Sequence, residues 1–154
     1  MASWRQQALI EAPVEEVWEV LADPVRGPDW DQDVLAITGA PVKIEKGSTF
    51  ELTGRGPLGL KGTTTFKVQE FDEMHELKMQ CEASGFYAHW LLTKAQDGTF
   101  TQLELGHEQE VLPEPALKDR AVRALYTKSY LRRAVDRTLD GLRRAVRSED
   151  VRTT

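Results

Sequence analysis

The chain has 154 residues, of which 40% are hydrophobic, and these values are typical of one domain with a substantial core. Its net charge of −5 and its pI of about 5.3 argue against a general nucleic-acid-binding protein. No apolar run is long enough to span a bilayer, no signal peptide is evident, and the single Cys81 excludes an intrachain disulfide framework. We therefore expect one cytoplasmic domain at residues 1–147, followed by a flexible tail at 148–154.

The N-terminal stretch predicts a strand followed by two short helices. Residues 3–11 alternate between apolar and polar side chains, which indicates a strand. Pro13 suits the first position of a helix, and apolar residues at helical spacing predict that this helix covers residues 13–22. A second helical turn or loop, at residues 27–31, carries Trp30.

Six further runs with alternating side chains predict strands separated by turns. They lie at residues 34–38, 48–53, 63–71, 74–82, 86–94 and 100–112. Centring the last three hairpins on their turns pairs Leu92 with Leu103, Trp90 with Leu105, Ala88 with His107, Met79 with Trp90, Cys81 with Ala88, Val68 with Leu77, Phe66 with Met79 and Thr64 with Cys81. All three registers place the apolar side chains on the same face, which favours a single antiparallel sheet.

Residues 114–147 predict a long amphipathic helix. Its apolar stripe consists of Leu117, Ala121, Ala124, Leu131, Val135, Leu139, Leu142 and Val146. Lys128 interrupts this stripe near its centre. Because the sheet also has one apolar face, we expect an α+β fold in which a curved antiparallel sheet of about seven strands wraps around the helix.

The stretch IEAPVEEVWEVLADPVRGPDW at residues 10–30 resembles the polyketide cyclase/dehydrase-like branch of the START (Bet v 1-like, SRPBCC, helix-grip) superfamily. The matching positions are Ile10, Ala12, Pro13, Glu16, Val17, Trp18 and Trp30. The resemblance implies a helix-grip fold with a cavity for hydrophobic ligands between sheet and helix. Some members cyclise or dehydrate polyketide chains, whereas others bind, carry or sense a ligand. No motif here matches a particular catalytic set.

Lys128 is one candidate catalytic residue. In a cavity its ammonium would bind a carboxylate or enolate oxygen, or exchange a proton if desolvation lowered its pKa. The alternative is a structural lysine whose stem crosses the edge of the core to reach a carboxylate on the sheet.

His107 is the second candidate. Its register places it on the inner face, where an imidazole can act as a general acid or base for enolisation or dehydration. The alternative is a histidine at the edge of the core, hydrogen-bonded to a neighbour.

Other inner-face residues either line the same cavity or form ordinary core. They are Phe50, Thr64, Phe66, Met79, Cys81, Trp90, Leu105, Gln109 and Ala124, and Trp30 is expected to cap the cavity mouth. Cys81 lacks a thiolate-stabilising cluster, so we do not expect it to be a nucleophile. No spacing of histidines resembles a zinc site, and we expect neither a metal nor a cofactor.

Arginines crowd the outer face of the last helix. They are Arg123, Arg132, Arg133, Arg137, Arg143, Arg144 and Arg147. They either dock an acidic partner such as an acyl carrier protein or form a solvated face paired with Asp136 and Asp140. The leading hypothesis is a cofactor-free cyclase or dehydratase that acts on a hydrophobic, aromatic or polyketide-like ligand. The alternatives are a carrier or sensor and a co-chaperone-like interaction module, in each case as a monomer or homodimer.

Overall fold

The computed structural model describes residues 3–83, 85–109 and 127–153. Its elements are β1 (Ser3–Ile10), α1 (Val14–Leu21), η1 (Pro24–Arg26), α2 (Gly27–Trp30), β2 (Val34–Thr38), β3 (Thr49–Arg55), η2 (Pro57–Gly59), β4 (Lys61–Asp72), β5 (Glu76–Cys81), β6 (Phe86–Ala95), η3 (Gln96–Gly98), β7 (Phe100–Gln109) and α4 (Lys128–Thr153). Among these elements, no helix is long and apolar enough to cross a membrane.

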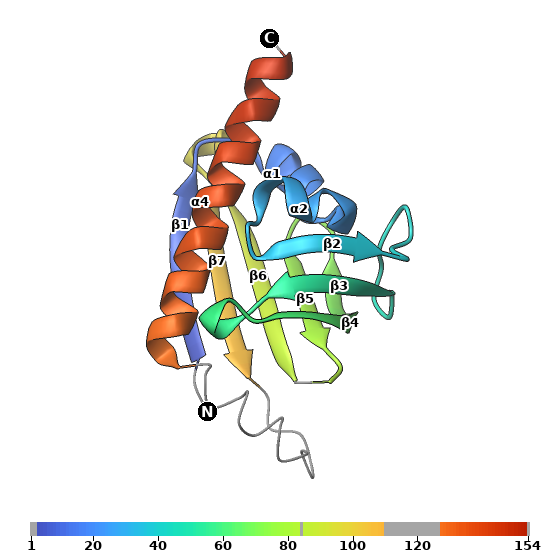
Figure 1. Cartoon of the computed structure of the whole chain (residues 1–154). Helices are drawn as coiled ribbons and strands as arrows, with labels where there is room; N and C mark the ends of the chain where they lie inside the picture. The colour runs from blue at the N-terminus through green and yellow to red at the C-terminus, as the bar shows by residue number, and fades with distance from the viewer. Residues whose placement is uncertain (1–2, 84, 110–126, 154) are drawn as a thin grey trace.

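The seven strands form one antiparallel sheet in the order β1-β7-β6-β5-β4-β3-β2. The sheet curves, and α4 runs along β1 and β7 with the short helices α1 and α2 beside it (Figure 1). This arrangement confirms the predicted α+β helix-grip fold. The two sheet edges, β1 and β2, lie on different sides of the molecule (Figure 1). The helix α4 contacts β1 directly, whereas α2 lies in contact with both α4 and β2.

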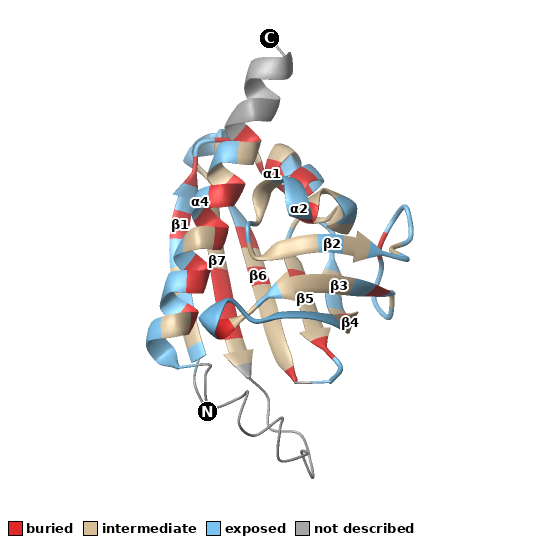
Figure 2. Ribbon diagram, in the orientation of Figure 1, coloured by how far each residue is buried: buried red, intermediate tan, exposed pale blue. Residues whose placement is uncertain are grey.

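The core lies between α4 and the inner face of the sheet. Apolar side chains of α4 are buried at the spacing that the sequence predicts, and Figure 2 shows buried positions recurring along the helix and in the strands behind it. These helix residues are Leu131, Val135, Leu139, Leu142 and Val146. Burial of one such leucine contributes about 1.5–3 kcal/mol. Ala124 and the rest of residues 110–126 lie outside the described residues, and α4 continues to Thr153 rather than ending near residue 147.

One of the three predicted hairpin registers is confirmed. The β6–β7 hairpin pairs Leu92 with Leu103, Trp90 with Leu105 and Ala88 with His107, as predicted. The other two registers are wrong by two residues or more. Met79 pairs with Ala88 and Leu77 with Trp90, whereas Val68 pairs with Met79 and Phe66 with Cys81.

Left-handed backbone conformations explain both errors. The β5–β6 turn includes Gly85 at φ 77°, and the β4–β5 turn includes Met74 at φ 66°. A methionine at positive φ is uncommon, so nothing in the sequence marks that turn centre. A register shift between Val68 and Glu70 then redirects the end of β4, and Phe71 packs edge-on against Trp18 with ring centroids 5.6 Å apart.

Candidate functional site

His107 lies on the inner face of β7, between Trp4 of β1 and Ala88 of β6 in the strand pairing. It is 7% exposed, and the ring of Phe86 packs edge-on against it at a centroid distance of 5.1 Å. Its Nδ1 has no hydrogen-bond partner among the described residues. Burial, and to a smaller extent the charge of Arg137, lowers the pKa of His107 from 6.5 to about 4. The imidazole is therefore neutral at physiological pH.

A cavity of about 320 Å³ opens beside His107, between the ends of β1 and β7 and the first residue of α4. Its lining consists of Ser3, Trp4, Arg5, Gly106, His107, Glu108 and Lys128. The two candidate catalytic residues therefore line one cavity. Lys128 itself is exposed and is the first residue of α4.

Trp4 is a lining residue that the sequence does not single out. Its indole Nε1 donates to Gln6 Oε1 at 3.1 Å, and Gln6 Nε2 in turn donates to Asp136 Oδ1 of α4 at 2.7 Å. Lys128 Nζ lies 5.6 Å from the centroid of the indole, within the range of a cation–π interaction. The sequence gives only a weak indication that Trp4 lines a cavity, because the strand alternation merely places it on the same face as Ala8 and Ile10.

A row of paired residues leads from this cavity across the inner face of the sheet. Trp4 pairs with His107, His107 with Ala88, Ala88 with Met79, and Met79 with Val68. Ala88 and Met79 are half-buried, whereas Val68 is fully buried. The row therefore runs from the polar lining of the cavity to apolar side chains on the inner face of the sheet.

The other predicted cavity residues have different surroundings. Phe50 is buried and stacks on Phe66 at a centroid distance of 6.2 Å, and Thr64 is half-buried on the same strand as Phe66. Cys81 is a buried free thiol, and Leu105 is fully buried. The side chain of Gln109 and the whole of Ala124 lie outside the described part of the chain.

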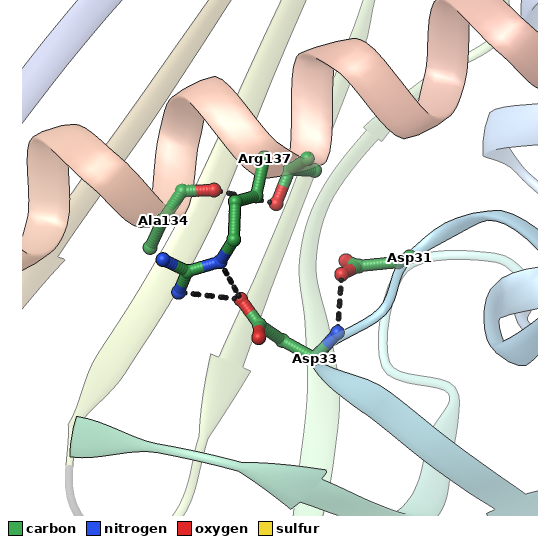
Figure 3. A network of polar contacts seen from close by, with 5 residues as sticks. Asp31, Asp33, Ala134 and Arg137 are labelled. Atoms are coloured by element: carbon green, nitrogen blue, oxygen red, sulfur yellow. Dashed lines mark hydrogen bonds and ion pairs between the residues drawn. The ribbon is translucent and has the colours of Figure 1, made fainter. Parts of the chain in front are cut away.

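A second polar cluster lies under the middle of α4 (Figure 3). Arg137 donates to Asp33 Oδ2 from Nη2 at 3.0 Å and from Nε at 3.3 Å, and the backbone N–H of Asp33 donates to Asp31 Oδ1 at 3.0 Å. Burial raises the pKa of Asp31 from 3.8 to about 6, helped by the charge of Asp33 and opposed by the backbone hydrogen bond and Arg137. Arg137 was expected on the outer basic face. That expectation is wrong, because the connection between α2 and β2 folds against this side of the helix.

Trp30 and Trp90 pack edge-to-face, with ring centroids 6.2 Å apart and an interplanar angle of 70°. Neither indole Nε1 has a hydrogen-bond partner among the described residues, and Trp90 is only 2% exposed. Trp30 lines a second cavity of about 300 Å³, between α2 and α4. The remaining lining residues of that cavity are Pro28, Asp29, Gln32, Gly141, Arg144 and Ala145. Trp30 and His107 therefore line separate cavities.

Within the described ranges, no three His, Cys, Asp or Glu side chains are grouped closely enough to hold a metal ion. His89 bonds Arg5 and Glu76 on the outer face of the sheet, and His75 bonds the backbone of its own turn. The polar groups that line the His107 cavity are its neutral imidazole, the Lys128 ammonium, the Trp4 indole, the Ser3 hydroxyl, the Arg5 guanidinium and the Glu108 carboxylate.

Comparison with solved structures gives the same fold. A START superfamily protein from Mycobacterium smegmatis matches with a TM-score of 0.73 at 13% identity, over 96% of this chain and 99% of that one. The Zhui aromatase/cyclase from Streptomyces sp. R1128 matches with a TM-score of 0.70 at 18% identity, over 94% and 93% of the two chains. Protein NE0264 from Nitrosomonas europaea matches with a TM-score of 0.71 at 14% identity, over 97% of both.

No curated protein sequence matches the chain. A family model described as polyketide cyclase / dehydrase and lipid transport matches residues 1–147. Since this match spans almost the entire sequence and the fold is that of START proteins, the chain belongs to the polyketide cyclase/dehydrase and lipid transport family.

Proposed function

We propose that this protein binds a small or medium-sized hydrophobic ligand, aromatic or polyketide-like, between the sheet and α4. Family membership supports hydrophobic ligand binding in general. The observation that carries the specific proposal is the buried His107, whose Nδ1 lacks a partner among the described residues beside a cavity of about 320 Å³. A buried polar atom left without a hydrogen bond costs about 1–3 kcal/mol, so a ligand that satisfies it gains that energy on binding.

The ligand's apolar body would lie along Ala88 and Met79, and its polar end would reach His107. Neutral imidazole presents either an N–H or a lone pair at Nδ1, depending on the tautomer. It can therefore bond a carbonyl or a hydroxyl group. A planar aromatic ligand also suits Trp4, whose indole is held in place through Gln6.

Matched ligands test this reading of His107. We expect 2-acetylnaphthalene, which carries a carbonyl, to bind the wild-type protein about tenfold more tightly than 2-ethylnaphthalene, as one buried hydrogen bond predicts. His107→Leu should abolish that preference in isothermal titration calorimetry. His75→Leu, the same change at an exposed turn, should leave it intact. Failure of both naphthalenes to bind the wild-type protein would contradict the proposed function.

A second candidate function is cofactor-free cyclisation or dehydration, favoured by the position of neutral His107 and cationic Lys128 on one cavity. His107 would take a proton from the carbon beside a ligand carbonyl. Lys128 would stabilise the negative charge that then develops on the carbonyl oxygen. A cavity that holds a flexible chain folded would supply rate by orientation. A carrier or sensor would use the same cavity without turnover.

The pH dependence of turnover separates these roles. Native mass spectrometry of the protein from its source would identify a co-purified ligand, which then serves as the substrate. Since the pKa of His107 is about 4, a base at this position predicts that kcat rises through pH 4 and is flat at neutral pH. His107→Leu should reduce kcat by about 10²-fold or more. Turnover that survives this substitution would rule out His107 as the base, and binding without turnover would favour the carrier.

Docking of an acyl carrier protein on the outer face of α4 remains a separate prediction. Arg133 is exposed there, but Arg137 is paired with Asp33, and Arg143 lies 3.7 Å from Asp140. The variant Arg133→Glu should weaken such docking in a pull-down assay. Undiminished docking would exclude this face as the contact surface.

A further inference from the structure

Two cations lie over the same aromatic ring at the edge of the proposed ligand cavity. Lys128 Nζ is 5.6 Å from the centroid of the Trp4 indole, and Arg132 Cζ is 5.9 Å from it. The two residues are one turn apart on α4, where like charges repel each other. Lys128 and Trp4 both line this cavity.

No carboxylate among the described residues forms an ion pair with either cation. Glu108 lines the same cavity, but its carboxylate accepts a hydrogen bond from Tyr87. Asp136, one turn further along α4, accepts the hydrogen bond from Gln6. Neither of these two carboxylates forms an ion pair with Lys128 or Arg132 in the described part of the chain.

We infer that Lys128, Arg132 and Trp4 form an anion subsite, and that the ligand is an amphiphile with an anionic oxygen group at one end. This inference rests on the proposed function. The anionic group, a carboxylate or a phosphate, lies between the two cations at the rim. The rest of the ligand then extends over Trp4, with a carbonyl or hydroxyl group at His107 and its apolar part towards Ala88 and Met79. An anion at this position removes the repulsion between Lys128 and Arg132 and forms charge-assisted hydrogen bonds with both.

Ligands that share one aromatic body isolate the effect of charge. At constant ionic strength, we expect 2-naphthoate to bind the wild-type protein about tenfold more tightly than uncharged 2-acetylnaphthalene, the gain expected of one hydrogen bond between charged groups. 2-Naphthyl phosphate tests whether the subsite prefers a phosphate or a carboxylate. Raising the salt concentration should weaken the binding of the two anions and leave the affinity for the ketone unchanged.

The double variant Lys128→Gln/Arg132→Gln should lose the preference for anions and still bind the ketone. Arg133→Gln/Arg143→Gln removes the same net charge from the outer face of α4, and this control should keep the preference. Equal wild-type affinities for ketone and anions would overturn the anion subsite and leave hydrophobic ligand binding intact. A preference lost equally in both double variants would assign it to the overall charge of the helix and would also overturn the subsite. If no naphthalene binds, the proposed function fails, and this inference fails with it.

Discussion

His107 and Asp31 are buried titratable side chains whose pKa values move in opposite directions. Burial lowers the pKa of His107 from 6.5 to about 4 and raises that of Asp31 from 3.8 to about 6. Between about pH 4 and pH 6.5 the unfolded chain binds more protons at His107 than the native state does, so this residue makes the fold more stable as the pH rises. The native state binds more protons at Asp31, so that residue makes the fold less stable as the pH rises. Each contribution amounts to about 3 kcal/mol, and the two nearly cancel.

Single substitutions should expose the two opposing contributions. Relative to wild type, we expect the free energy of unfolding of His107→Gln to fall by about 3 kcal/mol between pH 4 and pH 6.5, and that of Asp31→Asn to rise by a similar amount. Urea unfolding at half-unit pH intervals measures both. Asp29→Asn, which removes an exposed carboxylate, is the control. Variants that shift in the same direction would contradict this account.

The same residues show how far sequence reasoning reaches into the site. His107 was predictable as an inward residue because its strand belongs to a local hairpin with an Asp97-Gly98 turn. Trp4 was not, because its position depends on pairing between β1 and β7, which lie far apart in the sequence. Arg137 follows the polar period of its helix, and only the path of the α2–β2 connection determines that it meets Asp33.

Close contact between α2 and α4 depends on a glycine. A Cβ built on Gly141 would lie 2.0 Å from the backbone oxygen of Trp30, a distance that no side-chain rotation relieves. In an ordinary helix, replacing glycine by alanine stabilises by up to about 1 kcal/mol. Here the substitution must push the two helices apart, and this movement would disturb the packing of Trp30 against Trp90.

We therefore expect Gly141→Ala to reverse the usual sign and destabilise the fold by about 1–3 kcal/mol. Thermal and urea unfolding measure the change, and the altered packing of Trp30 should appear in near-ultraviolet circular dichroism. Gly62→Ala is the control, because a Cβ at that position has no atom within 4 Å. A Gly141→Ala variant as stable as wild type would show that α2 does not approach α4 this closely.

Element by element, prediction succeeded where the signal is periodic. The buried face of α4 and the single apolar face of the sheet follow directly from side-chain spacing. Two hairpin registers failed because the left-handed conformations at Met74 and Gly85 and the irregularity after Val68 move the turn centres. The apolar face survives such errors, since a shift by two residues leaves every side chain on its own side of the sheet.

At the scale of the whole molecule, α4 links the two edges of an open sheet. It packs along the β1 edge, and the Arg137–Asp33 ion pair joins it to the chain entering β2, the opposite edge (Figures 1 and 3). The carbonyl oxygen of Asp33 also accepts a hydrogen bond from Arg55 N–H at the end of β3. The charge of Arg137 lowers the pKa of both buried titratable groups, His107 and Asp31.

This arrangement predicts that one ion pair couples the two buried groups. Arg137→Gln should raise the pKa values of both His107 and Asp31, because a positive charge that lowers each is removed. Asp33→Asn should instead lower the pKa of Asp31, because the negative charge of Asp33 raises it. NMR titration of the His107 ring protons and of the Asp31 carboxyl carbon measures both shifts.

A double-mutant cycle gives the energy of the link itself. Arg137→Gln and Asp33→Asn should each destabilise the fold, and their coupling energy should be about 1 kcal/mol, since the pair is partly buried and joined by two hydrogen bonds. Arg143→Gln and Asp140→Asn remove a longer pair within the helix and should couple less strongly. If the Arg137 variant leaves the pKa of His107 unchanged while the coupling energy persists, the ion pair holds the sheet edge to α4 without setting the charge of the cavity. If both effects appear together, the contact that holds the helix against the β2 edge also adds to the effect of burial, which lowers the pKa of His107.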